Sequence, residues 1–547
     1  MIPAKFTGLF YRLTGGALSV FFMLIAFTYE GKGATPDQLK QAIVTQLETE
    51  TMSLPLPVRQ QQEALKAYYI ENDGAPLWIR HKRMTSLVEA LRNAELEGLS
   101  PGSYPTQTLM KASGLVSHAD ASGQAVVELY YSAFFLRFAR DLKVGRLLPR
   151  KVDPKLYWQE KAFDAGAAFR ILAGEQDMGG FIRRFQPQIK EYIGLKRILA
   201  NYRQIEKAGG WQAVPHGDVI NAGDENASIP AIYQRLAVTD GELKDKRGAD
   251  SRIYDEMLVE AVRRFQKLHG LEPDGVIGKQ TVFALNISVR DRIRQIIVTM
   301  ERWRWKPEQL GAHHILVNLA GYELRRVRNG KTEEVMRVAV GKPYHQSPVF
   351  SDKIKYLEFN PYWNVPRSIA VKEELPKLKA NPGARAARGF EAVVGDNAVP
   401  LTAIDWGGVT ASNFKFRIRQ RPGPKNALGR VKFMFPNKFN VYLHDTPARS
   451  LFNRAQRAFS HGCIRLARPL DLAEQLLESL PGWSREKIVG VLNVGERKIV
   501  NLAKPVPVHL TYSTVWLDEA GRARFSSDIY GRDARLEQAL AGRLASF

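Results

Sequence analysis

The sequence predicts a multidomain α+β protein in which helical segments come first and a mostly-β domain follows. With 547 residues, the chain is long enough for about three or four domains of ordinary size. Its hydrophobic content of 45% is normal for folded globular protein. Apolar residues recur mainly at helical spacing up to residue 285, and the two-residue spacing of strands begins at His313.

Residues 1–34 have the composition of an export segment. Lys5 and Arg12 precede an apolar run from Leu13 to Tyr29. As a helix this run spans about 25 Å, slightly less than the roughly 30 Å hydrocarbon core of a bilayer. The segment is therefore expected to be a signal peptide or an N-terminal membrane anchor. Lys32 and the absence of an Ala-x-Ala pattern disfavour a cleavage site at the end of this segment.

Residues 38–205 are expected to form a helical domain. The apolar positions at helical spacing include Met84, Leu87, Val88, Leu91 and Ala94. A second helix is predicted from Glu128 to Leu142, and its aromatic stripe indicates core packing rather than a ligand platform. A Gly/Pro/Asn-rich stretch after residue 205 marks the end of this domain.

Residues 206–290 are expected to form a smaller, compact helical domain. One helix has an apolar face made of Leu258, Ala261, Val262, Phe265 and Leu268. Gly270 ends this helix, and tight turns at Asp274-Gly275 lead to a second short helix from Thr281 to Leu285.

Residues 295–500 are expected to form the mostly-β domain. Asn329-Gly330, flanked by strand-like runs, is a strong signal for a β-hairpin. Between 367 and 429 the sequence becomes helical and loop-like and rich in lysine and arginine, which predicts an insertion that acts as a lid. The alternative is an inert solvated excursion. Residues 501–547 are assigned to a C-terminal extension.

Cys463 is the only cysteine of the chain, and it follows an export-like N-terminus. Exported proteins normally use cysteines in disulfide pairs, so a single thiol requires another explanation. A buried apolar thiol and a nucleophile are the two candidates. The polar, flexible and basic surroundings, Ser460-His461-Gly462 before the thiol and Arg465 after it, favour the nucleophile.

A thiol nucleophile needs a base, and two histidines lie close enough in sequence to be considered. His444 ends the run 438–444, whose alternating pattern predicts a half-buried strand with Tyr442 and His444 on one face. His461 lies on the turn before Cys463 and is expected to position other groups. A zinc site made of His444, His461 and Cys463 is disfavoured because no acidic or further histidine ligands accompany them. No metal or cofactor is expected.

The motifs around these residues resemble those of a known family. The runs Tyr442–Pro447 and Ser460–Arg465 resemble the catalytic motif of the L,D-transpeptidases, which crosslink bacterial peptidoglycan. The stretches 360–366 and 421–429 are similar to the same family. The pattern from Phe265 to Thr281 resembles the three-helix peptidoglycan-binding domain, and 38–205 the scaffold region of the large members of the family.

This resemblance implies a catalytic mechanism. Cys463 would be acylated by a tetrapeptide stem with release of D-Ala, and an acceptor amine would then resolve the thioester into a 3→3 crosslink. His444 would be the base, oriented by the main-chain carbonyl of Asp445, and the N–H groups of Gly462 and Cys463 would hold the oxyanion. Substrate contacts are expected from Tyr442, Trp363, Ser460, His461 and Arg465, although Arg465 is equally expected as a structural ion-pair partner and Trp363 as a core residue.

The expected partners follow from the charge and the resemblance. A formal net charge of +23 indicates anionic partners. Nucleic acid is excluded by the export segment and by the absence of any nucleic-acid-binding motif. Donor and acceptor stem peptides fit, and the resemblance adds cell-wall synthesis enzymes, a periplasmic location and anchorage in the inner membrane. A monomer is the default expectation.

Two alternative functions remain at this point. The same thioester resolved by water would make the protein an L,D-carboxypeptidase, and transfer to a protein lysine or a free D-amino acid is a variant of that chemistry. A non-catalytic scaffold that binds the cell wall belongs to a different class, and the presence of both Cys463 and His444 argues against it.

Overall fold

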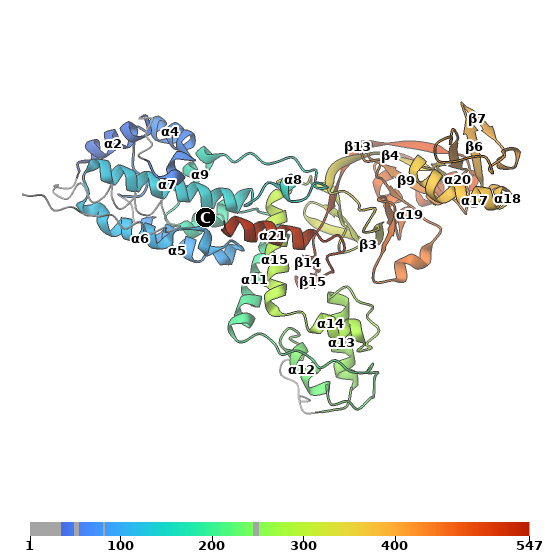
Figure 1. The fold of residues 1–547 in the computed structure, drawn as a ribbon, viewed down its shortest axis with the longest axis horizontal. Coiled ribbons are helices and arrows are strands. Elements are labelled where there is room, and N and C mark those ends of the chain that lie inside the picture. The colour runs from blue at the N-terminus through green and yellow to red at the C-terminus, as the bar shows by residue number, and fades with distance from the viewer. Residues whose placement is uncertain (1–33, 49–53, 80–82, 244–250, 546–547) are drawn as a thin grey trace, which may run out of the picture.

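The computed structural model describes residues 34–545 apart from 49–53, 80–82 and 244–250. Figure 1 shows a helical block at one end, a β domain at the other, and a small helical unit that projects between them. This arrangement confirms the predicted class, a multidomain α+β chain with a helical N-terminal region and a mostly-β C-terminal domain.

The N-terminal helices pack around one long, almost entirely buried helix, α7 (Ala121–Lys143). Inside this block, the Glu128 carboxylate accepts hydrogen bonds from the Tyr69 hydroxyl at 2.7 Å and the Trp78 N–H at 3.1 Å. The surrounding helices are α2 (Pro36–Glu48), α3 (Leu56–Arg59), α4 (Gln62–Glu71), α5 (Arg83–Arg92), α6 (Thr106–Leu115), α9 (Ala165–Ala173) and α10 (Met178–Phe185).

Two central helices, α11 (Lys190–Lys207) and α15 (Val289–Trp305), lie side by side in Figure 1. They share a separate hydrophobic cluster that also includes β14 (Val515–Leu517). The small helical unit lies between them in sequence and contains α12 (Ile229–Ala237), α13 (Glu256–Leu268) and α14 (Lys279–Leu285). The apolar face predicted for α13 is buried in the core of this unit, and the Asp255 side chain caps the helix by accepting from the Leu258 N–H.

The β domain is built on a nine-stranded sheet in the order β11-β3-β12-β10-β9-β4-β13-β1-β2. Because β2 also pairs with β3, eight of these strands close into a barrel. The strands are β1 (His313–Asn318), β2 (Glu323–Arg328), β3 (Lys331–Gly341), β4 (Phe350–Phe359), β9 (Val431–Met434), β10 (Leu443–His444), β11 (Ala458–Ser460), β12 (Ile464–Leu466) and β13 (Lys498–Thr511).

The predicted hairpin connects β2 and β3. Arg328 pairs with Lys331, and both turn residues have positive φ, 49° at Asn329 and 73° at Gly330. Asparagine and glycine tolerate this conformation best, so the local sequence determines the turn. Strand β13 continues past residue 500, and the barrel therefore includes residues that the sequence assigned to the C-terminal extension.

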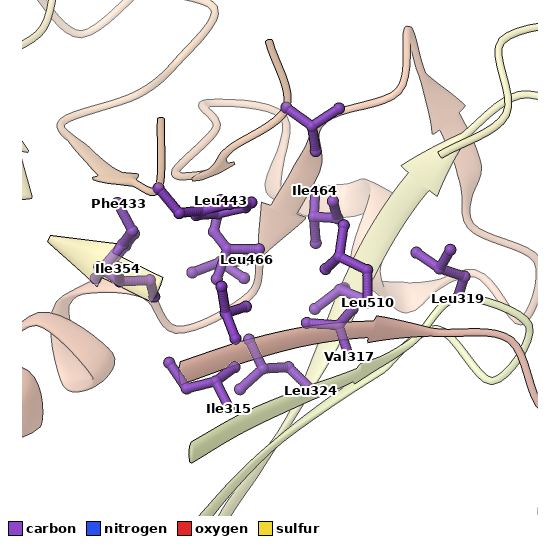
Figure 2. Packing of buried hydrophobic residues seen from close by; sticks show 14 of the residues in the cluster. Ile315, Val317, Leu319, Leu324, Ile354, Phe433, Leu443, Ile464, Leu466 and Leu510 are labelled. Carbon is purple, nitrogen blue, oxygen red and sulfur yellow. The ribbon is translucent and has the colours of Figure 1, made fainter. Parts of the chain in front are cut away.

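The barrel interior holds the largest hydrophobic cluster of the described residues. Figure 2 shows Leu443 and Ile464 among side chains that converge from opposite strands, with Val317 and Leu510 on the far wall. Helices α19 (Pro469–Leu477) and α20 (Arg485–Val494) and the C-terminal α21 (Arg532–Ala545) add apolar side chains to this cluster. Alternate residues of β10 and β12 consequently face away from the core.

The insertion between β5 (Trp363–Asn364) and β9 has its own small core and its own four-stranded sheet, β5-β8-β6-β7. The predicted helical and loop-like character is therefore incomplete, because short strands were missed. Their sequences are only three to five residues long, and pairing with one another and packing against the insertion's helices stabilises them. The elements are α16 (Arg367–Ile369), a π-helical turn (Ala370–Glu374), α17 (Leu375–Ala380), α18 (Pro382–Ala386), β6 (Phe390–Val394), β7 (Asn397–Val399) and β8 (Arg417–Gln420).

The expected membrane anchorage is not supported. Across the described part of the chain, no helix is both long enough and apolar enough to span a bilayer. This finding contradicts the predicted periplasmic location with an inner-membrane anchor. Of the segment 1–34 that carried the expectation, all but Ala34 lies outside the described residues.

Substitution of Leu443 tests whether packing in the barrel core holds β10 and β12 in place. We expect Leu443→Ala to lower the local stability of the barrel by about 2–5 kcal/mol, because a fully buried leucine is removed from a packed core. Hydrogen exchange of peptides from β10 and β12 measures this loss. Leu56→Ala, at a side chain that is 51% exposed, is the control and should leave exchange unchanged. Equal protection in both variants would contradict the described packing.

Candidate active site

The candidate site is built on the parallel pairing of β10 with β12. Leu443 pairs with Ile464, and both side chains are buried in the barrel core. His444 pairs with Arg465, and the Ile464 N–H donates to the Tyr442 carbonyl at 3.1 Å. Since side chains alternate along a strand, Tyr442, His444, Cys463 and Arg465 all lie on the face opposite the core.

The shared face of Tyr442 and His444, which the sequence predicted, is present. Their rings make an edge-to-face contact with centroids 5.6 Å apart. The strand itself is shorter than predicted, because only Leu443 and His444 have strand geometry and Asn440 adopts a φ of 53°. The segment before β10 is instead held by the Asn437 side chain, which bonds to the main chain of Phe439 and Val441.

The loop before Cys463 is fixed by Ser460. Its hydroxyl accepts from the Gly462 N–H at 3.0 Å and donates to the Cys463 carbonyl at 2.5 Å. The Gly462 carbonyl accepts from the Ser347 hydroxyl at 2.7 Å, and Gly462 has a φ of 120° that few other residues adopt. Ser460 therefore shapes the nucleophile loop from within the protein.

This hydrogen-bond pattern corrects one expectation. The Gly462 N–H already donates to Ser460, so in this conformation it is not free to hold an oxyanion. The Cys463 N–H, by contrast, has no hydrogen-bond partner among the described residues. Of the two main-chain donors that were expected, only that of Cys463 is available.

The Cys463 thiol is half-buried and lies 3.6 Å from the Asn440 carbonyl, to which it donates. Burial raises the pKa of the thiol, and hydrogen bonding by Tyr442 together with the charges of Lys432 and Arg465 opposes that rise. No hydrogen bond joins the sulfur to His444 within the residues that the structure describes. The predicted contact between the two groups stays a prediction.

His444 is buried and orients its ring through Nδ1, which lies 2.5 Å from the Asp445 carbonyl. A carbonyl can only accept, so Nδ1 carries the proton and Nε2 is the basic nitrogen. Burial is the main cause that lowers the pKa of His444 to about 3. The charges of Arg465 and Lys432 act in the same direction, and hydrogen bonds to the main chain of Asp445 and Leu428 oppose them. The imidazole is therefore neutral at physiological pH.

The Asp445 side chain fixes the main chain that holds His444. Its carboxylate accepts from the Arg430 N–H at 2.8 Å and the Thr446 N–H at 2.6 Å, and it pairs with the Arg449 guanidinium at 2.6 Å. The expectation for Asp445 concerned only its main-chain carbonyl. The structure adds a role for its side chain in positioning that carbonyl.

Lys432 is a site residue that the sequence analysis missed. It lies on β9 opposite His444, and its ammonium group is 4.1 Å from the Tyr442 ring centroid and 3.8 Å from a Glu358 carboxylate oxygen. Burial lowers its pKa, and Glu358 and Cys463 oppose this effect. The sequence could have indicated this position, because Val431 and Phe433 on either side are apolar core residues and strand alternation places Lys432 on the outer face.

Arg465 has no acidic partner among the described residues, although its Nε is buried. Its pKa is lowered by burial, and the nearby Cys463 thiol opposes this. Of the two expected roles for Arg465, the structural ion pair is therefore not observed. A guanidinium without a partner on this face can accept a carboxylate in a bidentate arrangement.

His461 and Trp363 connect the site to the insertion. His461 Nε2 lies 2.5 Å from the Glu373 carboxylate of the π-helical turn, and its ring lies 4.7 Å from that of His345. Trp363 packs at the edge of the insertion's core, 6.0 Å from the Phe390 ring. Neither Glu373 nor His345 was predicted, because both contacts join segments that are distant in sequence.

Comparison with known proteins assigns three regions of the chain. Residues 312–500 match the family model of the L,D-transpeptidase catalytic domain, residues 63–199 that of a scaffold domain, and residues 241–285 that of a peptidoglycan binding domain. The chain carries an L,D-transpeptidase catalytic domain. The resemblance noted in the sequence is thus confirmed, and Cys463, His444 and Arg465 all lie within that domain.

A protein of Haemophilus influenzae that bears the name L,D-transpeptidase is 35% identical over 226 residues, which are 41% of this chain and 45% of the relative. The chain thus spans less than half of that relative. Among solved structures, an L,D-transpeptidase from Xylanimonas cellulosilytica has 15% identity, covering 54% of this chain and 99% of its own, with a TM-score of 0.20. One from Mycobacterium smegmatis has 12% identity, covering 37% and 58%, with a TM-score of 0.18.

The charge state of the thiol in the L,D-transpeptidase domain sets a pH dependence. Because the pKa of Cys463 is raised and that of His444 is about 3, the pair is a neutral thiol and a neutral imidazole near pH 7. We expect alkylation of Cys463 by iodoacetamide to increase about tenfold per pH unit from pH 6 to 8.5, as the thiolate fraction grows. Mass spectrometry measures the rate, with N-acetylcysteine as the control. A plateau below pH 7 would instead indicate a thiolate–imidazolium pair.

Gly429 tests the support of Asp445. It has a φ of 63°, and a Cβ there would overlap the Asp445 carboxyl group. We expect Gly429→Ala to lower the free energy of unfolding of the L,D-transpeptidase domain by about 1–3 kcal/mol more than backbone strain alone would. Gly495→Ala is the matched control, because it has a φ of 79° with open space around it. Urea unfolding that gives equal losses for both variants would refute the overlap.

Proposed function

We propose that the protein is a cysteine-dependent L,D-transpeptidase that forms 3→3 crosslinks between peptidoglycan stems. The observation that carries this proposal is that the thiol of Cys463, the neutral imidazole of His444 and the unpaired guanidinium of Arg465 lie on one outward face of the paired strands. An acyl transfer through a thioester needs a nucleophile, a base and a group that holds an anionic substrate, and this face supplies all three.

Acylation begins when a rotation about χ1 of Cys463 carries the sulfur from the Asn440 carbonyl towards His444. Catalytic hydrogen bonds in unliganded enzymes are often long and tighten only when substrate is bound. His444 Nε2 takes the thiol proton, and the thiolate attacks the carbonyl carbon of the third stem residue. The C–N bond to D-Ala then breaks, His444 returns its proton to the leaving amine, and a thioester remains on Cys463.

The oxyanion formed during attack is held by the Cys463 N–H, which is the main-chain donor left free by the Ser460 network. Removal of one such donor in other enzymes costs about 2.7–4 kcal/mol of transition-state stabilisation. Lys432 and Arg465 add positive charge around the sulfur and favour both the thiolate and the oxyanion.

Deacylation follows the same steps with a different nucleophile. The side-chain amine of an acceptor stem attacks the thioester carbonyl, His444 accepts a proton from that amine, and the C–S bond breaks. The proton then returns from His444 to the sulfur, which restores the thiol. The products are a new amide bond between two stems and the free enzyme.

Substrate positioning is assigned to Arg465, Tyr442 and the insertion. Arg465 binds a stem carboxylate, and Tyr442 holds the polar groups beside it. The insertion acts as a lid whose Glu373 contacts His461 next to the nucleophile loop, and Trp363 lies at its hinge side. The scaffold and peptidoglycan binding domains present the polymer. Other cell-wall synthesis enzymes as partners, and a monomeric state, stay predictions.

Purified protein incubated with a disaccharide-tetrapeptide tests the proposal directly. We expect a dimer with loss of one D-Ala, and a covalent mass increase on the protein after addition of a carbapenem. Cys463→Ala should abolish both results, because no other residue of the chain carries a thiol. Mass spectrometry reads the products and the protein.

Each alternative function gives a different product in this experiment. A tripeptide without dimer would identify an L,D-carboxypeptidase, because water would have resolved the thioester. A product with a free D-amino acid or a protein lysine would identify those acceptors. Unchanged product in Cys463→Ala would overturn the assignment of Cys463 as the nucleophile. Absence of product from both proteins would favour the alternative function, a non-catalytic scaffold that binds the cell wall.

A further inference from the structure

A cavity of about 500 Å³ lies where the peptidoglycan binding domain meets the barrel. One wall is the turn after α13, residues Gly270–Pro273. The other walls are β3 around Arg337, the loop 454–457, and β15 (Ala523–Phe525) with the segment that follows it. The loop 454–457 lies in the segment that connects β10, which carries His444, to the Cys463 loop before β12. One wall of the cavity is therefore close in sequence to the candidate site.

The cavity carries an excess of positive charge that the protein does not neutralise. Lys267, Arg337, Arg454 and Arg457 line it, and none of them forms an ion pair with an acidic side chain of the described residues. Arg468 and Arg524 also line the cavity, but they form ion pairs with Glu334 and Glu323. Glu272 is the one acidic side chain among the described lining residues that has no ion pair. A ligand that fits this lining is an anion.

Arg457 is the most buried of these four cations. It is only 8% exposed, and its guanidinium donates to the carbonyl oxygens of Val338, Tyr322 and Arg454, which carry no net charge. Burial, with a smaller contribution from the nearby Arg337, lowers its pKa to about 10, and Tyr322 and Glu323 oppose this shift. A buried cation without a counter-charge is unfavourable, and a bound carboxylate would relieve this.

The backbone at the cavity is also strained. Tyr322 has a φ of 52°, a conformation that is rare for a residue with an aromatic side chain. Its carbonyl is held in place by the Arg457 guanidinium at 3.1 Å and by the Val338 N–H at 2.9 Å. Strain of this kind persists where the surrounding structure enforces it, and it concentrates at ligand-binding sites.

We propose that this cavity binds a carboxylate-bearing stem peptide, as a second substrate site that spans the peptidoglycan binding domain and the L,D-transpeptidase domain. The inference rests on the proposed function, since it assigns the stem that is not attacked. Arginine forks match carboxylates bidentately, and the stems of peptidoglycan carry several carboxylates.

The position of the cavity suits this role. Ala339 on β3 pairs with Arg465, and Arg337 lies two residues further along the same strand, a distance of about 7 Å. Arg465 is itself two residues from Cys463, so the cavity begins about 14 Å from the thiol along the strands. An extended tetrapeptide spans about 13–14 Å, and a stem anchored in the cavity can therefore reach the thioester.

Binding measurements on charge-reversed variants test the proposal. An N-acetylated stem tetrapeptide with free carboxylates is titrated by calorimetry into Lys267→Glu and Arg454→Glu, each combined with Cys463→Ala so that no thioester forms. We expect about tenfold weaker binding in each than in Cys463→Ala alone, as for one lost charge-assisted contact. Both side chains are exposed at the rim, so the variants should fold. Lys279→Glu is the matched control, since it makes the same charge change on an exposed residue of the same domain outside the cavity.

Two further probes separate the ligand classes. The same tetrapeptide with its carboxylates amidated should bind Cys463→Ala about tenfold more weakly, and inorganic phosphate should not displace the acidic peptide. Equal loss of binding in Lys279→Glu would show that the net charge of the protein, and not the cavity, determines binding, and it would overturn the proposal. Displacement by phosphate at concentrations equal to those of the peptide would overturn it too, because the cavity would then be a general anion site.

Failure of this inference is distinguishable from failure of the proposed function. Binding is measured in the Cys463→Ala background, where no turnover occurs, so loss of binding in Lys267→Glu and Arg454→Glu supports the cavity even if no crosslink forms. Conversely, crosslinked dimer from the unmodified protein, combined with unchanged tetrapeptide binding in both variants, would refute the cavity and leave the transpeptidase intact.

Discussion

The site depends on one structural constraint, the register in which β10 pairs with β12. Leu443 and Ile464 are buried in the barrel together, and this places Cys463, His444 and Arg465 together on the opposite face. A shift of one residue in either strand would turn a charged or polar side chain into the core. It would also separate His444 and Arg465 from Cys463. Burial of two aliphatic side chains thus fixes the arrangement of the polar ones.

Burial also sets the electrostatics of this face. It raises the pKa of the Cys463 thiol and lowers that of the His444 imidazole, so the two groups rest as neutral partners. The positive charges of Lys432 and Arg465 oppose the rise in the pKa of the thiol and so favour its thiolate form. In the proposed function, such a resting state would keep the thiol unreactive until substrate brings the base and the nucleophile together.

Two regions outside the barrel connect to the nucleophile through short segments of chain. The insertion reaches the loop before Cys463 through the contact between Glu373 and His461. The junction with the peptidoglycan binding domain reaches it through the loop 454–457, which lies in the connection between the two catalytic strands. Both regions are therefore continuous in the chain with the segments that hold Cys463 and His444.

The sequence by itself determined the features that depend on local chemistry. It identified the lone thiol of Cys463, the β2–β3 hairpin at Asn329-Gly330 and the common face of Tyr442 and His444, because turn preference and strand alternation act over a few residues. Only the tertiary structure decided that Lys432 and Glu373 join the site, that the Gly462 N–H is already engaged, and that short strands of the insertion form a sheet. Those features arise from pairing between distant segments, and their stability comes from partners that no local pattern of residues reveals.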